Sequence, residues 1–413
     1  MKKLTSKQKE NIWYWIATVA RLLLAVTFIF SGFVKAIDPL GTTYKIEDYL
    51  NAFGGWFTNF LPAAQPLAMA MIAFEFTLGV LLLFNVWIKF DSIMALLFML
   101  VMTPLTLYLA IENPVTDCGC FGDAVVLTNW QTFWKNIVLL ALVIILLIGK
   151  KYLRPRFVPM AEWCIFFIGV VGALGIMTYS LLHLPMIDFR PYKIGNVIRE
   201  GMEIPDDAEE DEYSVTYIYE KDGVQQEFTL ENYPKDDSTW TFVAQNSKLL
   251  KQGYVPPIHD FVIYSDLNGD ITDEVLDDPG TTVFAVMYDL NKTNRKQAAK
   301  LNKIYYEALQ KGYKFYALSA STSDEVEAFI AETDAQYEIC NMDGTQLKTI
   351  VRANPGVFVI KNGTIIDKYN VRQKNVEGIS APLVLPQLQE EVVEIQDTLV
   401  EEAEDEDMYM MIE

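Results

Sequence analysis

Histidine and cysteine are scarce in this 413-residue chain, which contains two histidines and four cysteines. His183 and His259 are too few for a His-rich metal site. Four cysteines do not make a disulfide framework in a chain of this length. The sequence also lacks a glycine-rich phosphate loop, a nucleophile elbow, a repeat of fixed period and a basic nucleic-acid patch. The distribution of hydrophobic and charged residues is therefore the main source of information.

Charge divides the chain into two unlike parts. Residues 1–183 hold 13 Lys and Arg against 10 Asp and Glu, whereas residues 184–413 hold 20 against 44. The first part is typical of a membrane protein and the second of an acidic soluble region. Because the acidic part repels polyanions, the sequence argues against nucleic acid and anionic lipid headgroups as its partners.

The first part contains five apolar stretches long enough to cross a bilayer, which takes about 20 residues in a helix. The first stretch follows several lysines, but it exceeds the roughly 7–15 apolar residues of a signal peptide, so we expect a retained anchor. The lipid bilayer is therefore the first predicted partner. The predicted spans are Ile12–Ile37, Pro66–Val86, Asp91–Ile111, Phe133–Gly149 and Pro159–Leu182.

Basic residues predict the orientation of these helices, because cytoplasmic loops are enriched in Lys and Arg. Four lysines precede the first span, Lys89 lies between the second and third, and the connection 149–157 carries four basic residues. All three segments fall on one side of a protein that crosses five times. We therefore expect a cytoplasmic N-terminus, with the loop around residue 118 and the acidic part on the opposite side, where disulfides persist.

Beyond residue 184 the pattern changes from membrane spans to short strands. Two strands around Lys221-Asp222-Gly223 predict a hairpin, and an alternation β-α-β-α-β-β from residue 282 to 369 predicts an α/β sheet domain. Its predicted elements include helices Arg295–Lys311 and Ser323–Glu332, the latter capped by Ser323. The predicted divisions are 1–158 (four-helix membrane domain), 159–183 (fifth membrane helix), 184–257 (β-rich connector), 258–372 (sheet domain) and 373–413 (acidic tail).

The loop between the third and fourth spans carries the clearest chemical signal. Cys118 and Cys120, separated only by Gly119, are candidates for a redox couple, because a strained and exposed disulfide is easily reduced. A structural disulfide and an interhelix cap are the alternatives. Asp117 and Asp123 flank the pair and argue against a reactive thiolate, since nearby negative charge disfavours it. Two thiolates leave a zinc site two ligands short, so we predict no metal.

Several residues of the first part resemble a known group. Arg21, Phe30-Ser31-Gly32, Lys35 and Asp38-Pro39 resemble the first helix and following loop of the DoxX superfamily of small four-helix membrane proteins. Asp117-Cys118-Gly119-Cys120-Phe121-Gly122 resembles the signature loop of its methylamine-utilisation branch, the MauE family. The resemblance covers residues 12–150. It implies a bacterial inner-membrane protein that supports folding or disulfide formation of an envelope protein, beside a thioredoxin-like partner.

The second part resembles thioredoxin-like proteins of the TlpA type over residues 258–372. Residues 259–261 are similar to their opening strand, and residues 353–360 to the strand that carries a cis-proline, here Pro355. The active cysteine pair of such a domain should follow the strand at 282–288, where this chain has no cysteine. The resemblances together predict an all-α membrane bundle, DoxX-like with a fifth helix, followed by an α/β thioredoxin-like periplasmic domain that binds a partner.

Arg21 lies within the first predicted span, and Glu75 lies near the middle of the second. A carboxylate in a bilayer is costly and should face the bundle interior, so we expect Glu75 to pair with Arg21 in a structural role. Cys164 is expected to be a packing residue of the fifth helix. Cys340 is expected to be buried, the alternative being an exchange partner for the loop cysteines.

Three hypotheses for the function follow. The first is a thiol–disulfide component that supports maturation of envelope proteins, with Cys118 and Cys120 as the couple and the outer domain presenting clients. The second is a non-enzymatic membrane scaffold with a redox-inactive docking domain. The third is a small-molecule channel or carrier built on Glu75 and Arg21. The first hypothesis lacks an evident electron acceptor: the sequence indicates no cofactor, and a quinone is allowed but not indicated.

Overall fold

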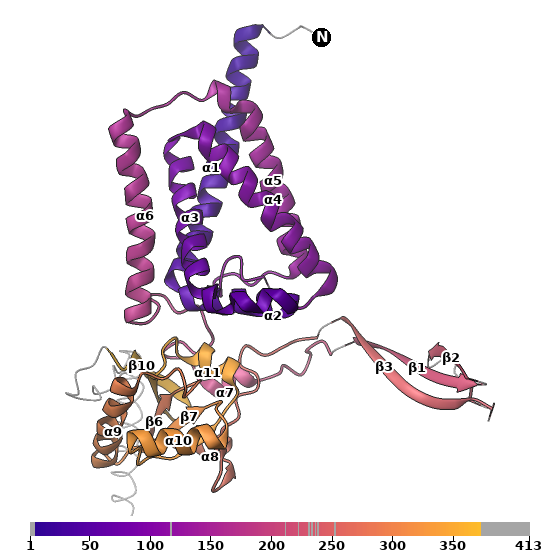
Figure 1. Cartoon of the computed structure of the whole chain (residues 1–413), viewed down its shortest axis with the longest axis vertical. Helices are drawn as coiled ribbons and strands as arrows, with labels where there is room; N and C mark the ends of the chain where they lie inside the picture. The colour runs from indigo at the N-terminus through magenta and orange to yellow at the C-terminus, as the bar shows by residue number, and fades with distance from the viewer. Residues whose placement is uncertain are drawn as a thin grey trace, which may run out of the picture.

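The structure, a computed structural model, describes residues 5–115, 118–210, 212–221, 223–229, 232, 234–235, 237, 239–251 and 253–372. A helical bundle forms the N-terminal part, drawn above the sheet domain in Figure 1. The predicted acidic tail, 373–413, lies outside the described residues. The helical elements of the first part are α1 (Ser6–Ile37), α2 (Pro39–Phe53), η1 (Gly55–Ala63), α3 (Ala64–Phe84), α4 (Ile88–Glu112), α5 (Asn129–Gly149), η2 (Lys150–Tyr152) and α6 (Pro159–Leu182).

Five helical segments are long and apolar enough to cross a membrane, which confirms the five predicted spans. The second begins earlier than predicted, because η1 runs directly into α3 from Gly55 to Phe84. Large apolar side chains such as Val26, Val101 and Ile168 remain exposed on the outer faces of the bundle. Exposed apolar surface of this extent marks a membrane-facing region. The chain is a multi-pass membrane protein.

Helices α1 and α3 approach each other through two glycines. A Cβ on Gly32 would lie 2.7 Å from the backbone nitrogen of Phe76, and a Cβ on Gly79 would lie 2.7 Å from the backbone nitrogen of Ile29. Small residues allow membrane helices to meet backbone to backbone. The two contacts fix the antiparallel register of α1 against α3.

Helix α2 lies across one end of the bundle, on the side of the sheet domain (Figure 1). It begins at Pro39, with Asp38 as its cap, and the Asp38 carboxylate accepts a hydrogen bond from the Gly41 N–H at 3.0 Å. Proline is favoured at the first helical position, because the N–H that it lacks would have no partner within the helix. Aspartate is favoured before it, because its carboxylate accepts a hydrogen bond from one of the free N–H groups of the first turn. This cap turns the chain sharply out of α1, so that α2 covers the loop between α4 and α5.

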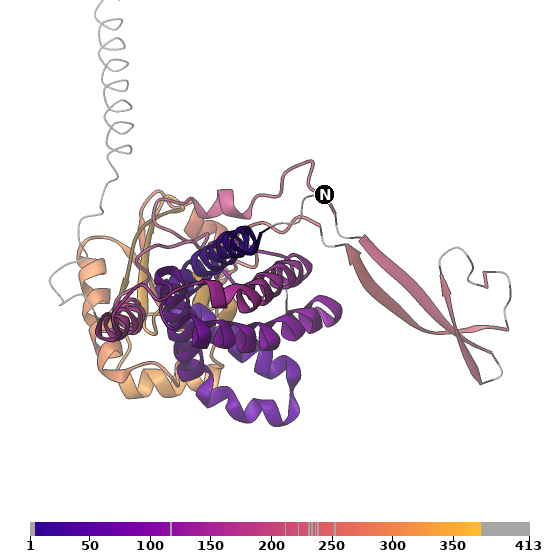
Figure 2. The same cartoon turned by 90° about the horizontal axis from the view of Figure 1, so that it is seen from above.

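A three-stranded antiparallel sheet projects away from both the bundle and the sheet domain (Figures 1 and 2). Its strands are β1 (Glu212–Lys221), β2 (Val224–Thr229) and β3 (Thr241–Lys251), in the order β2-β1-β3. The pairing of β1 with β2 confirms the predicted hairpin.

The C-terminal domain contains a seven-stranded sheet in the order β10-β9-β6-β7-β8-β4-β5. The central strand β6 pairs in parallel with β7 and antiparallel with β9. A parallel pair joined through a helix, with a hairpin on its other side, is the arrangement of a thioredoxin fold, and the predicted fold class is confirmed. The elements are α7 (Ile198–Met202), β4 (Tyr264–Ser265), β5 (Gly269–Asp270), α8 (Thr272–Leu276), β6 (Thr281–Val286), α9 (Arg295–Gln310), β7 (Lys314–Ser319), α10 (Ser323–Thr333), β8 (Ile339–Asn341), α11 (Gly344–Ile350), β9 (Gly356–Lys361) and β10 (Thr364–Asn370).

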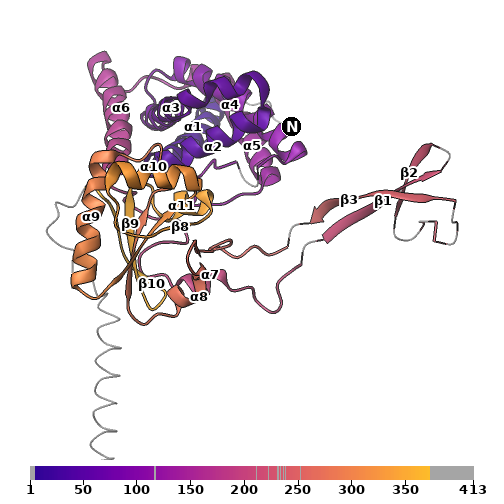
Figure 3. The same ribbon diagram turned by 60° about the horizontal axis from the view of Figure 1, so that its bottom comes forward.

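Both faces of this sheet are covered. Phe284 of β6 belongs to the core that includes α8 and α11, whereas its neighbour Val283 belongs to the core that includes α9 and α10. Alternation along a strand sends successive side chains to opposite faces. Figure 3 shows α9 on one side of the strands and α8 on the other. One detail of the prediction is wrong: α10 is capped by Thr322 rather than Ser323, and the Thr322 N–H donates to the Glu325 carboxylate at 3.0 Å.

The close approach of α1 and α3 predicts a specific sensitivity to added volume. Gly79→Ala should lower the stability of the bundle by about 1–3 kcal/mol, as overpacking typically does. Gly175→Ala in α6 is the matched control, because its Cβ would meet nothing within 4 Å. Both substitutions replace glycine by alanine in a helix, so they gain the same intrinsic helix propensity. A difference between their melting temperatures in detergent therefore measures the effect of packing against the neighbouring helix. Equal melting temperatures would contradict the proposed contact.

Candidate functional site

The loop between α4 and α5 makes a tight turn at its two cysteines. Gly119 and Gly122 both have positive φ, at 60° and 53°. The Gly122 N–H donates to the Gly119 carbonyl at 3.0 Å. A Cβ on Gly119 would lie 3.0 Å from Cγ of Lys45 in α2. Glycine is therefore required at 119 both for the backbone conformation and for the approach of α2.

The backbone carbonyls of both cysteines are held by neighbouring helices. The Ser31 hydroxyl of α1 donates to the Cys120 carbonyl at 2.6 Å, and the Tyr49 hydroxyl of α2 donates to the Cys118 carbonyl at 2.5 Å. Both cysteines are free and only 9% exposed. A hydrogen bond joins their side chains. The fold thus brings the predicted pair together as adjacent thiols, while Asp117 lies outside the described residues.

The pKa values of the two thiols are shifted in opposite directions. The hydrogen bond from Cys118 lowers the pKa of Cys120, burial opposes this shift, and the ammonium groups of Lys135 and Lys35 add to the lowering. The same hydrogen bond and then burial raise the pKa of Cys118. Negative charge therefore settles on Cys120, while Cys118 keeps its proton. Such an asymmetric pair has one good leaving sulfur and one sulfur open to attack.

Lys135 of α5 is a site residue that the sequence analysis missed. Its Nζ lies 4.3 Å from the ring centroid of Phe121, and that ring packs against Phe30 with 5.4 Å between centroids. The loop itself thus orients the cation beside Cys120. A signal was available, because Lys135 is the single charged residue between Asn129 and Gly149. A lone charge within a membrane span marks a functional position.

Glu75 pairs with Lys35, and the predicted Arg21–Glu75 pair is wrong. The Lys35 Nζ lies 2.8 Å from the Glu75 carboxylate, and both side chains are buried. The register set by Gly32 and Gly79 explains this partner, because it places the end of α1 beside the middle of α3. The prediction matched Arg21 with Glu75 by their positions along the two separate helices. Those positions alone do not reveal how the helices are aligned against each other.

Arg21 has a different role, at the far end of α3. Its guanidinium donates to the carbonyls of Leu82 and Leu83, which belong to the last turn of that helix. The final carbonyls of a helix have no partner within it and carry partial negative charge. Arg21 therefore caps α3 and lies away from the cysteine loop.

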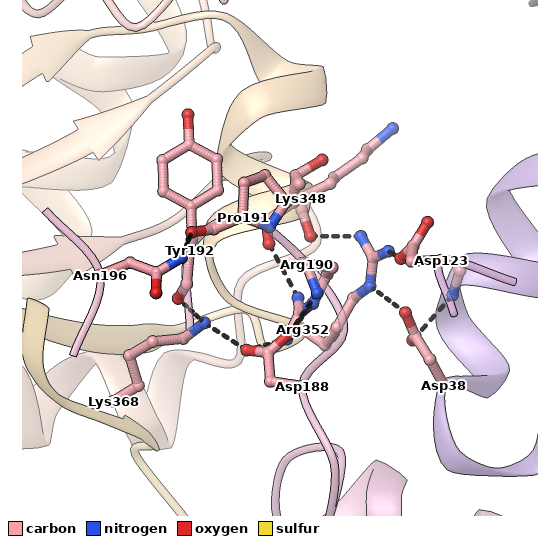
Figure 4. A network of polar contacts seen from close by, with 12 residues as sticks. Asp38, Asp123, Asp188, Arg190, Pro191, Tyr192, Asn196, Lys348, Arg352 and Lys368 are labelled. Atoms are coloured by element: carbon pink, nitrogen blue, oxygen red, sulfur yellow. Dashed lines mark hydrogen bonds and ion pairs between the residues drawn. The ribbon is translucent and has the colours of Figure 1, made fainter. Parts of the chain in front are cut away.

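Arg352 connects the sheet domain to the cysteine loop. It follows α11, and its guanidinium lies 2.8 Å from the Asp38 carboxylate and 3.4 Å from that of Asp123 (Figure 4). Arg352 is 7% exposed. Although burial alone would raise the pKa of Asp38, Arg352 and Arg190 outweigh it and lower that pKa. Asp123, which the sequence places beside the thiol pair, takes part in this ion pair; its predicted effect on the thiols stays a prediction.

A second buried network ties the segment after α6 to the same domain. The Asp188 carboxylate lies 2.7 Å from Arg190 and 2.7 Å from Lys368, and the Arg190 guanidinium also donates to the Thr349 carbonyl at 2.8 Å (Figure 4). Burial raises the pKa of Asp188, but the two cations overcome it and lower the pKa to about 2. The chain leaving the membrane is therefore fixed to the sheet domain within a few residues of α6.

The place of a thioredoxin cysteine pair is occupied by polar contacts. The Thr293 hydroxyl donates to the Asn354 side chain at 2.9 Å, and the Asn354 amide donates to the Asp289 carbonyl at 2.8 Å. The Asn354–Pro355 bond is cis, as predicted. Tyr288 packs edge-to-face on Tyr44 of α2, with 6.4 Å between ring centroids. This face of the sheet domain therefore contacts the membrane domain beside the cysteine loop.

The other two cysteines take no part in the site. Cys340 in β8 is buried, as predicted, and burial with nearby Glu338 raises its pKa to about 12. Such a thiol is a poor nucleophile near neutral pH. Cys164 is exposed on α6. Its predicted role as a packing residue is wrong, because α6 presents most of its surface outward.

Two cavities border the cysteine loop. One, of about 510 Å³, is lined mainly by apolar residues of α2, α3 and α4 and includes Cys118, Gly119 and Cys120. The other, of about 200 Å³, lies between the loop, α2 and the sheet domain; its lining includes Gly119, Asp123 and Arg352. The loop therefore separates a mostly apolar space within the bundle from a polar space under the sheet domain.

Comparisons with known proteins agree with parts of this description. Residues 13–149 match the family described as methylamine utilisation protein MauE. Residues 213–252, the projecting sheet, match a domain of unknown function, DUF8463. No curated protein matches the chain. One solved structure that matches is the solution structure of a Bacteroides thetaiotaomicron protein, provisionally assigned as a protein disulfide isomerase. Its sequence is 13% identical and the TM-score is 0.24; the match covers 29% of this chain and 79% of the Bacteroides chain. The DoxX and TlpA relationships stay predictions.

The electrostatics of Cys120 predict a pH profile for alkylation. In a Cys164→Ala background, the rate of Cys120 modification by iodoacetamide should reach half its maximum below the pH of an ordinary thiol. Lys135→Gln removes a cation that lowers the Cys120 pKa and should move the profile to higher pH. Lys135→Arg keeps the charge and is the matched control. Superimposable profiles for Gln and Arg would contradict the role of Lys135.

The Arg352 ion pairs predict how the two domains are held together. Arg352→Met leaves the half-buried Asp38 carboxylate without its nearest cation, which costs at most the roughly 3–5 kcal/mol typical of a fully buried charge. Hydrogen exchange in α11 and α2 should rise, and the melting temperature should fall. Arg199→Met, which removes an exposed ion pair with Asp277, should cost about 0–1 kcal/mol.

The same pair predicts a pH dependence with a definite sign. Because the pKa of Asp38 is lowered in the folded protein, its contribution is present above the ordinary aspartate pKa and is lost as pH falls through the lowered value. Asp38→Asn should remove this part of the acid sensitivity. For the preceding comparison, an Arg352→Met protein as stable as the Arg199→Met protein would contradict the stabilising role of the Arg352 ion pairs.

Proposed function

We propose that the protein is a bacterial inner-membrane thiol–disulfide oxidoreductase of the DoxX/MauE type, in which Cys118 and Cys120 exchange disulfides with an envelope protein. The observation that carries this proposal is the hydrogen-bonded thiol pair with negative charge directed to Cys120. The inert thiol of Cys340 is, by contrast, buried beside the Glu338 carboxylate. A pair supplied with two ammonium groups is instead tuned for exchange.

The exchange step follows from the difference between the two sulfurs. In the oxidised protein, a client thiolate attacks Cys118 Sγ, the Cys118–Cys120 bond breaks, and Cys120 leaves as the stabilised thiolate. The second client thiolate then attacks the client sulfur of the mixed disulfide and releases Cys118, which takes up a proton. Two electrons pass from the client to the pair, and the client gains a disulfide. A low pKa favours Cys120 as the leaving group.

The sheet domain supports this chemistry without a dithiol of its own. Its degenerate thioredoxin face contacts α2, and Arg352 holds it over the loop through Asp38 and Asp123. We place the N-terminus in the cytoplasm and this domain in the periplasm, on the basis of the basic residues between the spans. The polar cavity beneath the domain then gives an extracytoplasmic client a route to the loop.

A second candidate is a non-enzymatic scaffold, favoured by one observation. Thr293 and Asn354 fill the position where a thioredoxin would carry its cysteines. In that case the thiol pair is a loop staple when oxidised and has no client. The two candidates differ in the reduction potential of the pair, since structural disulfides lie below about −300 mV.

The test uses the purified full-length protein in glutathione redox buffers. We expect the Cys118–Cys120 disulfide to form and break reversibly, with a potential above about −300 mV. The oxidised protein should also oxidise a dithiol peptide, and Cys118→Ser and Cys120→Ser should both abolish this reaction. Cys164→Ser is the matched control and should retain it. A lower potential together with no peptide oxidation would favour the scaffold.

A further inference from the structure

The larger cavity at the cysteine loop opens toward the membrane. Its walls include Leu67 and Phe74 of α3 and Leu97 and Val101 of α4, and these four side chains are also exposed on the outer surface of the bundle. In a bilayer, surface of this kind contacts hydrocarbon. A molecule can therefore enter the cavity sideways between α3 and α4 without passing through water. Its occupant is a lipid-soluble compound.

The inner end of the same cavity is polar and reactive. Cys118 and Cys120 line it together with Lys35, whose ammonium is fixed 2.8 Å from Glu75. A buried lysine–carboxylate pair is costly in a membrane, and apolar residues of the same size would pack there at lower cost. The pair thus places a hydrogen-bond donor and a proton source beside two thiols, in a space that is otherwise apolar.

The thiol pair also needs an acceptor for its electrons. Among the described residues, neither remaining cysteine can supply one: Cys340 is buried in the sheet, and Cys164 is exposed on α6. A phospholipid acyl chain fits an apolar cavity, but it offers no acceptor for the Lys35 ammonium and no oxidising power. A conjugated ring with two carbonyl groups and an apolar tail meets all three conditions, and about 510 Å³ accommodates such a ring with part of its tail.

We propose that this cavity is the binding site of a membrane quinone that oxidises the Cys118–Cys120 dithiol. The inference rests on the proposed function and specifies the direction of electron transfer, from the dithiol client through the cysteine pair to the quinone. The Cys118 S–H bond breaks, and one S–S bond forms between Cys118 and the Cys120 thiolate. Two electrons from the sulfurs and two protons, one from Cys118 and one from the Lys35 ammonium, pass to the carbonyl oxygens of the quinone, which leaves as the hydroquinone. Lys35 regains its proton from the client dithiol, which releases two protons when it reduces the pair again. Lys35 positions one carbonyl by hydrogen bonding.

The experiment measures quinone reduction by the purified, reduced full-length protein in lipid nanodiscs. Duroquinone is the probe, because its fully substituted ring cannot add thiols. We expect stoichiometric reduction of duroquinone with formation of the Cys118–Cys120 disulfide, and none in Cys118→Ser or Cys120→Ser. Leu97→Trp fills the mouth of the cavity and should slow quinone reduction at least about tenfold, while peptide dithiol oxidation by the pre-oxidised protein is unchanged.

Leu100→Trp is the matched control, because Leu100 is an exposed residue of the same helix that does not line the cavity. It should reduce duroquinone like the unsubstituted protein. If Leu97→Trp gives no folded protein, Leu67→Trp on the opposite wall replaces it, with the same expected loss. Equal quinone reduction rates for the cavity and control variants would overturn the quinone site.

The outcomes separate the two proposals. Peptide dithiol oxidation without any duroquinone reduction would overturn the quinone site and leave the thiol–disulfide function in place. Absence of both reactions would overturn both. A tightly held phospholipid that copurifies with the protein and is not displaced by duroquinone would identify an acyl chain as the occupant and overturn the quinone assignment.

Discussion

The close approach of α1 to α3 is the constraint on which the cysteine site depends. Gly32 and Gly79 allow the two backbones to meet, with Gly32 against Phe76 and Gly79 against Ile29. This register puts Lys35 beside Glu75 and leaves Ser31 facing the loop, where it holds the Cys120 carbonyl. One of the two cations that act on Cys120, Lys35, is thus positioned by glycines that do not contact a sulfur; the other, Lys135, is oriented by Phe121. A change in the separation of α1 and α3 would therefore affect both the acidity of Cys120, through Lys35, and the loop backbone, through Ser31.

The sheet domain keeps the strand arrangement of a thioredoxin fold but lacks a cysteine pair at the position where such a fold carries one. Its central sheet and cis-proline are intact, but its cysteine position is closed by Thr293 and Asn354. The sheet domain meets α2 through the ring of Tyr288, and Arg352 reaches the membrane domain. A buried arginine with two carboxylates is specific in geometry, because its planar guanidinium matches their spacing. The domain is thus fixed in place over the thiol pair.

The sequence predicts some of this arrangement for clear physical reasons. The five spans follow from apolar runs, the strands from periodicity, and the thiol pair from its own motif. The partner of Glu75 was mispredicted, because helix register depends on glycines in two different spans. Arg352 was not identified, since nothing local in the sequence relates it to Asp38. Cys164 was misjudged for another reason: an apolar helix residue packs against lipid as readily as against protein, and hydrophobicity does not distinguish the two.

The cysteine loop lies between two cavities, and this position explains why a thiol pair separated by only one residue suits the proposed reaction. Gly119 lines both the apolar cavity and the polar cavity, together with Thr42 and Lys45 of α2, so the two spaces adjoin at the cysteine loop. A protein client is soluble in water and a quinone in lipid, and neither enters the phase of the other. A pair joined by one residue allows each reactant to approach the same sulfurs from its own phase. Under the proposed function, no movement of the sheet domain is then needed between the two halves of the cycle, and the Arg352 contacts can remain formed throughout.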